Sequence, residues 1–191
     1  MNAESAHSLS QADKKILLGV ARSAIQHQLE KGVRLQIVAS DYAKELQAQR
    51  ASFVTLNRQS MLRGCIGHLE ALKPLVEDVA ENAFAAAFND PRFPPLASHE
   101  LADLEIHISV LTPSVQLPFA SETDLLKQIR PYKDGLILID GMHRGTFLPS
   151  VWEQLPEPKS FLQHLKRKAG LPEDYWSEQL QVFRYETESF S

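Results

Sequence analysis

The residues best suited to chemistry lie in one short segment, residues 62–67, with the sequence Leu-Arg-Gly-Cys-Ile-Gly. Cys65 is the only cysteine of the chain, and a thiolate is a strong nucleophile once a nearby cation lowers its pKa. Arg63 is the cation nearest in sequence, and alternation along a strand places it on the same face as Cys65. His68 falls on the opposite face and is a poor partner unless Gly67 marks a bulge. Cys65 is therefore the candidate catalytic residue and Arg63 a candidate ligand-binding residue.

Two interpretations of this segment remain open. Gly64 and Gly67 have no side chains, so a ligand could approach the strand closely at both positions, which makes them candidate ligand-binding residues beside the thiol. Alternatively, Cys65 is a small, buried and inert side chain, because free cysteine is among the most buried residue types. The two glycines would then serve only the packing of the sheet.

A second candidate group lies in residues 89–96, Asn-Asp-Pro-Arg-Phe-Pro-Pro-Leu. Three prolines fix φ and remove hydrogen-bond donors, so we expect a stiff, irregular loop. Arg92 could present its planar guanidinium to a carboxylate or phosphate together with Arg63, with Phe93 as a neighbouring ligand contact. The alternative for Arg92 is a local ion pair with Asp90.

His107 and Thr146 complete the candidate ligand-binding residues. His107 belongs to the polar face of residues 104–111, where apolar and polar residues alternate as in a half-buried strand. It is either a ligand contact or an exposed histidine of the sheet. Thr146 and a helical turn at Pro149 form either a site wall, with free N–H groups for an anion, or a plain strand-to-helix corner. The histidines and Asp140 lack metal-ligand spacing on one element, so no metal site is predicted.

Composition narrows the class of protein. A length of 191 residues fits one domain or two small lobes, and the apolar fraction of 43% is ordinary for a globular protein. The net charge of -4 argues against a nucleic-acid surface, and the densest basic run, residues 166–168, is expected to be a solvated helix face. A single cysteine excludes an intrachain disulfide. No apolar run suits a membrane span or a signal peptide, so a cytoplasmic location without membrane partners is expected.

The hydrophobic pattern predicts an α+β fold with a mainly antiparallel sheet and helices packed on it, because helices interleave irregularly with hairpin-like strand pairs. Ser10 and Asp13 resemble a capping box and Gly32 is a suitable helix stop. The polar residues 1–12 are expected to be flexible. Helices are expected in residues 10–31, 42–49, 74–88, 121–130 and 160–169, and strands in residues 51–57, 61–68, 104–111, 135–140, 146–148 and 179–185.

Several segments together resemble the AMME syndrome candidate gene protein family, whose bacterial members are called AmmeMemoRadiSam system protein A. The similarity follows the family's motif order over residues 16–190. It implies a single α+β domain spanning residues 1–191, with an antiparallel sheet and two lobes around a cleft where the motifs converge. The segments that carry it are residues 62–67, 90–96, 106–112, 146–149 and 165–170.

The resemblance also implies partnership with a Memo-like protein, related to extradiol dioxygenases, and with a radical SAM protein. It supplies neither a reaction nor a cofactor, so two functions stay open. One is a cleft-bearing enzyme or substrate-handling protein that acts with those partners on a small molecule or modified macromolecule, through Cys65, Arg63 and Arg92. The other is a non-catalytic protein-binding scaffold. RNA binding is disfavoured by the acidic charge balance.

Overall fold

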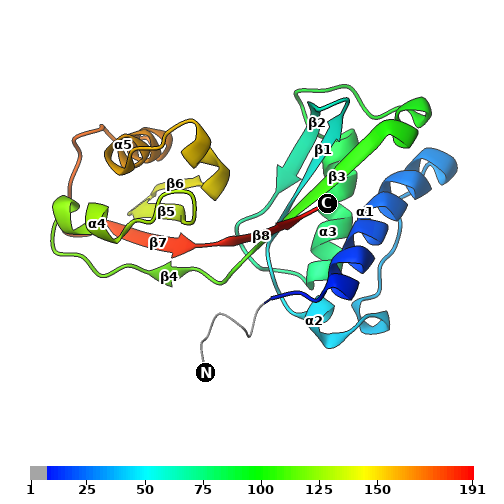
Figure 1. Ribbon diagram of the computed structural model, residues 1–191, viewed down its shortest axis with the longest axis horizontal. Coiled ribbons are helices and arrows are strands. Elements are labelled where there is room, and N and C mark those ends of the chain that lie inside the picture. Colours follow the sequence, from blue (N-terminus) through cyan, green and yellow to red (C-terminus); the bar gives the residue numbers. More distant parts are fainter. Residues whose placement is uncertain (1–7) are drawn as a thin grey trace. The chain divides into compact units, whose positions relative to one another are not determined.

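The computed structural model describes residues 8–191, which form two compact units (Figure 1). Unit 1 comprises residues 8–111 and 188–191, and unit 2 comprises residues 112–187. Residues 1–7, part of the stretch expected to be flexible, lie outside the described residues. Beyond them, Ser8 and the backbone N–H of Leu9 donate hydrogen bonds to the carboxylate of Glu188.

Unit 1 is a four-stranded sheet with two long helices on one face. The strand order is β2 (Met61–Gly67), β1 (Ser52–Arg58), β3 (Leu104–Leu111) and β8 (Thr187–Phe190), and β1 is antiparallel to both of its neighbours. Helices α1 (Gln11–Lys31) and α3 (Leu75–Phe88) lie side by side (Figure 1). Their buried apolar residues form one core with alternate residues of the strands, among them Val54, Leu56 and Ile108, all fully buried.

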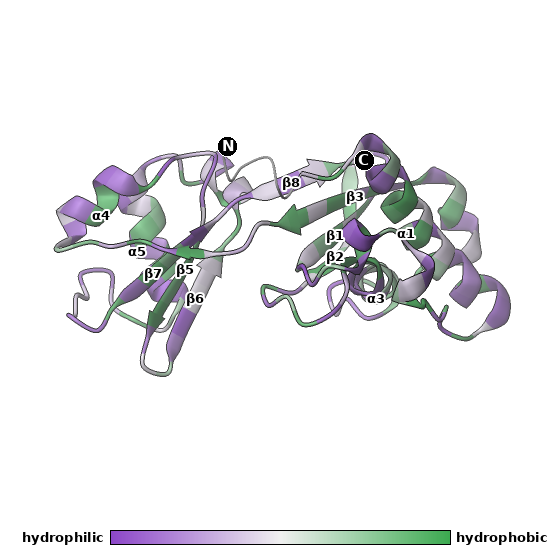
Figure 2. Ribbon diagram, turned by 90° about the horizontal axis from the view of Figure 1, so that it is seen from below, coloured by the Kyte–Doolittle hydropathy of each residue, from purple (hydrophilic) through white to green (hydrophobic). Residues whose placement is uncertain are grey.

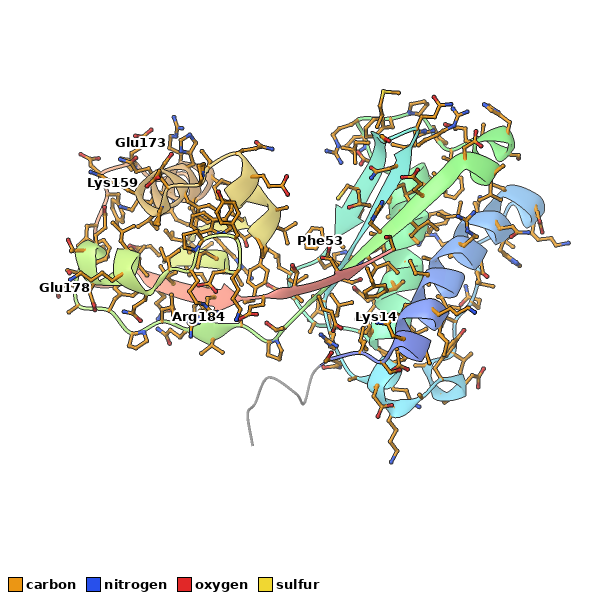
Figure 3. The ribbon with its side chains drawn as sticks, in the orientation of Figure 1. Lys14, Phe53, Lys159, Glu173, Glu178 and Arg184 are labelled. Atoms are coloured by element: carbon orange, nitrogen blue, oxygen red, sulfur yellow. The ribbon has the colours of Figure 1, made fainter. Side chains whose placement is uncertain are left out.

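The ends of α1 follow the predicted signals. Ser10 and Asp13 form a capping box, and Gly32 ends the helix in the left-handed conformation with φ 70°. α1 carries both apolar and polar residues, in green and purple in Figure 2. From its polar side Lys14, labelled in Figure 3, reaches Glu188 of β8 at 2.8 Å. Capping signals and periodicity were therefore sufficient to predict this helix.

The segment after α1 is less helical than predicted. Residues 42–49 were expected to form a helix, but only the four-residue helix α2 (Lys44–Gln47) occurs within them, and the short helix η2 (Ala39–Asp41) precedes it. Gln49 forms an isolated bridge with Pro74, and the backbone carbonyl of Ala48 accepts a hydrogen bond from Leu75. These contacts hold the chain in an extended conformation and end the helix early.

The β1–β2 hairpin contains a bulge that changes which residues face each other. Its two turn residues, Gln59 and Ser60, both have positive φ values, of 52° and 61°. Leu56 pairs with Gly64 and the next residue, Asn57, pairs with Leu62, so one residue of β2 is left without a partner. That residue is Arg63, and the regular alternation assumed for this strand is interrupted there.

Unit 2 is built around a second antiparallel sheet of four strands. The order is β4 (Val115–Gln116), β7 (Gln181–Tyr185), β5 (Gly135–Asp140) and β6 (His143–Phe147). Three further helices complete the unit: α4 (Glu122–Gln128), η4 (Pro149–Glu153) and α5 (Pro158–Lys168). The core is centred on the stacked rings of Trp152 and Phe161, whose centroids are 3.8 Å apart.

The prediction of a solvated basic face on α5 was wrong for Lys166. This side chain is fully buried, and its Nζ donates to Glu122 at 2.6 Å and to the backbone carbonyl of Glu173. A buried ammonium is tolerated only when it is paired and hydrogen-bonded. Arg167 beside it is half exposed, as predicted.

The predicted α+β class with antiparallel strands is confirmed, with the strands divided between two sheets. The sequence did not predict η3 (Ser98–Asp103), β4 or β8. A cleft between the lobes stays a prediction. None of the helices within residues 8–191 combines the length with the apolar composition that a transmembrane span requires.

Candidate functional site

Cys65 lies in β2 with its side chain on the face of the sheet that α3 leaves open. Its neighbour Gly64 faces α3, because a Cβ added there would lie 2.1 Å from the carbonyl oxygen of Ala86. Cys65 points the other way. Thr55 is its partner on β1, and the two side chains form a hydrogen bond, with 3.2 Å between Sγ and Oγ1.

His107 extends this contact into a row across three strands. Thr55 pairs with Cys65 on one side and with His107 on the other. Side chains directly opposite each other have Cβ atoms about 4.5–5.5 Å apart. The Nε2 atom of His107 is shielded from solvent and has no hydrogen-bond partner among the described residues. A thiol, a hydroxyl and an imidazole therefore lie in series on one face of the sheet.

Protein atoms fill the space beside each of the two glycines that flank Cys65. Gly64 lies against the backbone of α3, and a Cβ on Gly67 would lie 2.3 Å from the ring of Phe53. Phe53, labelled in Figure 3, belongs to β1 and pairs with Gly67. The space that a ligand would need at both positions is thus filled, as in the packing interpretation of these glycines.

Asp90 holds the loop of residues 89–96 against the outer edge of β2. Its buried carboxylate accepts the backbone N–H of Cys65 at 2.9 Å and two bonds from the guanidinium of Arg92, at 2.9 and 2.7 Å. Arg92 Nη2 also donates to the carbonyl of Cys65 at 3.2 Å. Because β2 is an edge strand, these side chains satisfy backbone groups that no neighbouring strand reaches. Asp90 and Arg92 therefore satisfy the free backbone N–H and carbonyl groups of the edge strand at Cys65.

The same contacts shift the pKa values of Asp90 and Arg92, the two charged residues beside Cys65. Hydrogen bonds from the Arg92 guanidinium hold the pKa of Asp90 well below its usual range. The pKa of Arg92 is raised, chiefly by hydrogen bonding to Asp90. The predicted ion pair with Asp90 is therefore present. Arg92 is still 54% exposed, and its Nη1 forms no hydrogen bond to any residue that the structure describes.

Arg63 and Phe93 lie beside this group. The guanidinium of Arg63 binds Glu100 at 2.8 and 3.0 Å and the carbonyl of Pro94 at 3.0 Å. Hydrogen bonding to Arg63, followed by that from the N–H of Ala97, lowers the pKa of Glu100 to about 2. The ring of Phe93 lies 5.9 Å from the guanidinium carbon of Arg63 and 5.6 Å from that of Arg92. The two arginines thus meet at Phe93, each already paired with a carboxylate.

His68 is directed away from the Cys65 row. Its Nδ1 is 3.4 Å from Oδ1 of Asp78, a buried residue of α3. Burial raises the pKa of Asp78, and hydrogen bonds from Ser52 and the interaction with His68 oppose that rise. Since α3 covers the face opposite Cys65, His68 does not form a dyad with the thiol, in line with the expectation from strand alternation.

Thr146 belongs to unit 2 and serves its packing. Its hydroxyl donates to the carbonyl of Leu136 at 2.9 Å and lies 3.4 Å from the hydroxyl of Tyr185. Burial raises the pKa of Tyr185 to about 12, and the contact with Thr146 opposes this. Within residues 8–191 no three His, Cys, Asp or Glu side chains are arranged to hold a metal ion.

Comparison with known proteins identifies the family. The AMMECR1 family model matches residues 18–190. The chain belongs to the AMMECR1 family. A protein of Methanothermobacter thermautotrophicus is 38% identical over 184 residues, which cover 95% of each chain. A protein of Methanopyrus kandleri is 36% identical over 191 residues, covering 95% of this chain and 89% of the relative.

A solved structure supports the fold of this AMMECR1-family chain. The crystal structure of an uncharacterized protein from Pyrococcus horikoshii is similar to it with a TM-score of 0.80 and 35% sequence identity. The match covers 91% of this chain and 88% of that one. The resemblance recognised from the sequence motifs is therefore confirmed at the level of family and fold.

Sequence reasoning missed two residues of this AMMECR1-family site, Thr55 and Glu100. It also missed the contact that Asp90 makes with Cys65. Asp90 was considered only as a partner of Arg92. Its second contact, to the N–H of Cys65, depends on the loop folding back along β2. Glu100 gave no signal because η3 lacks a periodic pattern. Thr55 could have been found from the hairpin register, but only with knowledge of the bulge.

Proposed function

We propose that this chain carries out group transfer on a small molecule, with Cys65 as the nucleophile. The observation that supports this proposal is the row of Cys65, Thr55 and His107. Thr55 contacts the thiol and lies opposite His107, whose buried Nε2 has no hydrogen-bond partner among the described residues. For the first step the His107 ring turns to bring Nε2 within hydrogen-bond distance of the Thr55 hydroxyl. The thiol proton then passes to that hydroxyl as the hydroxyl gives its own proton to Nε2. The sulfur then forms a bond to an electrophilic carbon of the substrate.

The rest of the cycle balances without an added oxidant or reductant. The leaving group departs with the bonding electron pair and takes the proton from His107. A second nucleophile, water or an acceptor molecule, then attacks the same carbon and displaces Cys65, which regains a proton. Arg92 lies beside the thiol, where its Nη2 donates to the backbone carbonyl of Cys65. Its free Nη1 is available to an anionic group of the substrate.

The test measures the alkylation of Cys65 by iodoacetamide, which is specific because the chain has no other cysteine. Mass spectrometry at pH 7 should show that the wild type reacts faster than N-acetylcysteine. His107→Gln and Thr55→Val should each slow the reaction about tenfold or more, because they remove the proton acceptor or the relay. Ser109→Ala is the matched control, since Ser109 lies on the same face of β3 as His107 and its hydroxyl bonds to Ser189. A wild-type rate equal to that of the free thiol would contradict the proposal.

We also propose that the protein acts with a Memo-like protein and a radical SAM protein. The support for this is membership of the AMMECR1 family, together with the resemblance to bacterial members named for such a system. The alternative is a non-catalytic scaffold. It is favoured by Met61 and Leu62 at the start of β2, whose side chains are 66% and 44% exposed beside Arg63.

Co-purification tests both ideas. Tagged wild-type protein should retain a co-expressed Memo-like or radical SAM protein, and the double variant Met61→Ser/Leu62→Ser should lose at least tenfold of that capture because its apolar contact area is removed. Met142→Ser is the control, since Met142 is 98% exposed but belongs to unit 2. Retention of cellular function by Cys65→Ser together with its loss in the double variant would establish the scaffold. No capture by the wild type would refute the partnership.

A further inference from the structure

A separate cavity of about 310 Å³ lies in unit 1, beside the helices that cover the face of the sheet opposite Cys65. It is bounded by α1, by residues 34–37 and by α3. The helices α1 and α3 lie side by side (Figure 1). Its volume is at the lower end of the range of about 300–1,000 Å³ typical of ligand sites. The cavity therefore suits a ligand smaller than a nucleotide.

Arg34 is a cation of this cavity without an acidic hydrogen-bond partner. Its guanidinium carbon lies 4.2 Å from the ring centroid of Phe84, so the group is stacked and oriented by a cation–π contact. It forms no hydrogen bond and no close ion pair with any of residues 8–191. The other cation of the cavity, Lys73, is in contact with Glu81. Arg34 therefore keeps the planar donor fork that recognises a carboxylate.

Glu77 supplies an acceptor in the same cavity. Its Oε1 accepts the backbone N–H of Ala39 at 3.3 Å, and its Oε2 forms no hydrogen bond within the described residues. Glu77 and Glu81 are one turn apart on α3 and line the same cavity. The pKa of Glu81 is lowered chiefly by its hydrogen bond to Lys73 and, to a smaller extent, by the charge of Arg34. The guanidinium of Arg34 and Oε2 of Glu77 therefore remain as one hydrogen-bond donor group and one acceptor group.

The remaining lining is apolar and includes Leu35, Ile37 and Ala80. We propose that this cavity binds a free aliphatic α-amino acid. The ligand carboxylate binds Arg34, its ammonium group binds Oε2 of Glu77, and its side chain packs on Leu35 and Ile37. A zwitterion keeps the site electrically neutral, as the two cations and two carboxylates that line it already are. The site is independent of the proposed chemistry at Cys65.

Isothermal titration of the full chain with three probes tests this proposal. L-leucine should bind saturably. 4-Methylpentanoate, which lacks the ammonium group, should bind about tenfold more weakly, since one charge-assisted hydrogen bond contributes about that factor. Isoamylamine, which lacks the carboxylate, should show no saturable binding over the same concentrations.

Variants assign the two contacts. Arg34→Gln should weaken leucine binding at least tenfold, and Arg34→Lys should restore only part of it because lysine lacks the planar fork. Glu77→Gln should weaken leucine binding but leave that of 4-methylpentanoate unchanged. Lys15→Gln, at an exposed position of α1, is the control. The proposal is overturned if leucine does not bind saturably, if isoamylamine binds as tightly as leucine, or if Arg34→Gln binds leucine like the wild type with an unchanged thermal midpoint.

Discussion

Replacement of Gly64 by alanine is expected to lower the free energy of unfolding of unit 1 by about 3 kcal/mol or more. The new Cβ would lie 2.1 Å from the carbonyl oxygen and 3.0 Å from the carbonyl carbon of Ala86. Both are backbone atoms in the last turn of α3, so the clash cannot be relieved by rotating a side chain. Either β2 or α3 has to move, and β2 carries Cys65.

Gly19→Ala is the matched control for this prediction. Gly19 lies inside α1, and a Cβ there meets no atom within 4 Å. The substitution should stabilise the protein by about 0.5–1 kcal/mol, because alanine has the higher helix propensity. Urea unfolding followed by far-UV circular dichroism measures both effects, and hydrogen exchange of residues 52–67 assigns them to unit 1. Equal stability of Gly64→Ala and wild type would show that the close approach to α3 is wrong.

Asp90→Asn is expected to lower the free energy of unfolding by about 2 kcal/mol at pH 7. The carboxylate accepts three side-chain and backbone hydrogen bonds from Arg92 and one from Cys65, and its side chain is 1% exposed. Hydrogen bonds to a charged group contribute about 1.5–3 kcal/mol each, but Arg92 is half exposed and partly regains hydration, which reduces the loss. Asp41→Asn, at an exposed position of the same unit, should change stability by no more than about 0.5 kcal/mol.

The effect of Asp90→Asn should depend on pH in a defined direction. The pKa of Asp90 in the folded protein lies well below its usual range, chiefly because of the hydrogen bonds from Arg92. The stabilisation is therefore complete above the ordinary aspartate pKa of about 4 and is lost as the pH falls below it toward the lowered value. The free energies of unfolding of wild type and variant, measured from denaturation curves, should converge as the pH falls from 7 to below the ordinary aspartate pKa of about 4. A difference that grows as the pH falls would contradict the proposed role of the carboxylate.

Elements with strong local signals could be predicted from the sequence. The strict alternation of residues 104–111 gives the bounds of β3, and the capping box and Gly32 give those of α1. The short strands β4 and β8 could not be predicted, because two to four residues carry no usable period and their pairing depends on distant strands. Lys166 was misjudged for a related reason. Its burial depends on Glu122, 44 positions earlier in the chain.

The sequence by itself determined the family, the α+β class and the position of the Cys65 segment in a hairpin strand next to Arg63. It did not determine what Cys65 faces. A regular hairpin with the turn at Gln59 and Ser60 would pair Thr55 with Gly64, whereas the bulge at Arg63 pairs Thr55 with Cys65. Only the packed structure decides between these registers, because the observed one places Gly64, which has no Cβ, against the backbone of α3. That long-range contact turns the thiol toward Thr55 and His107.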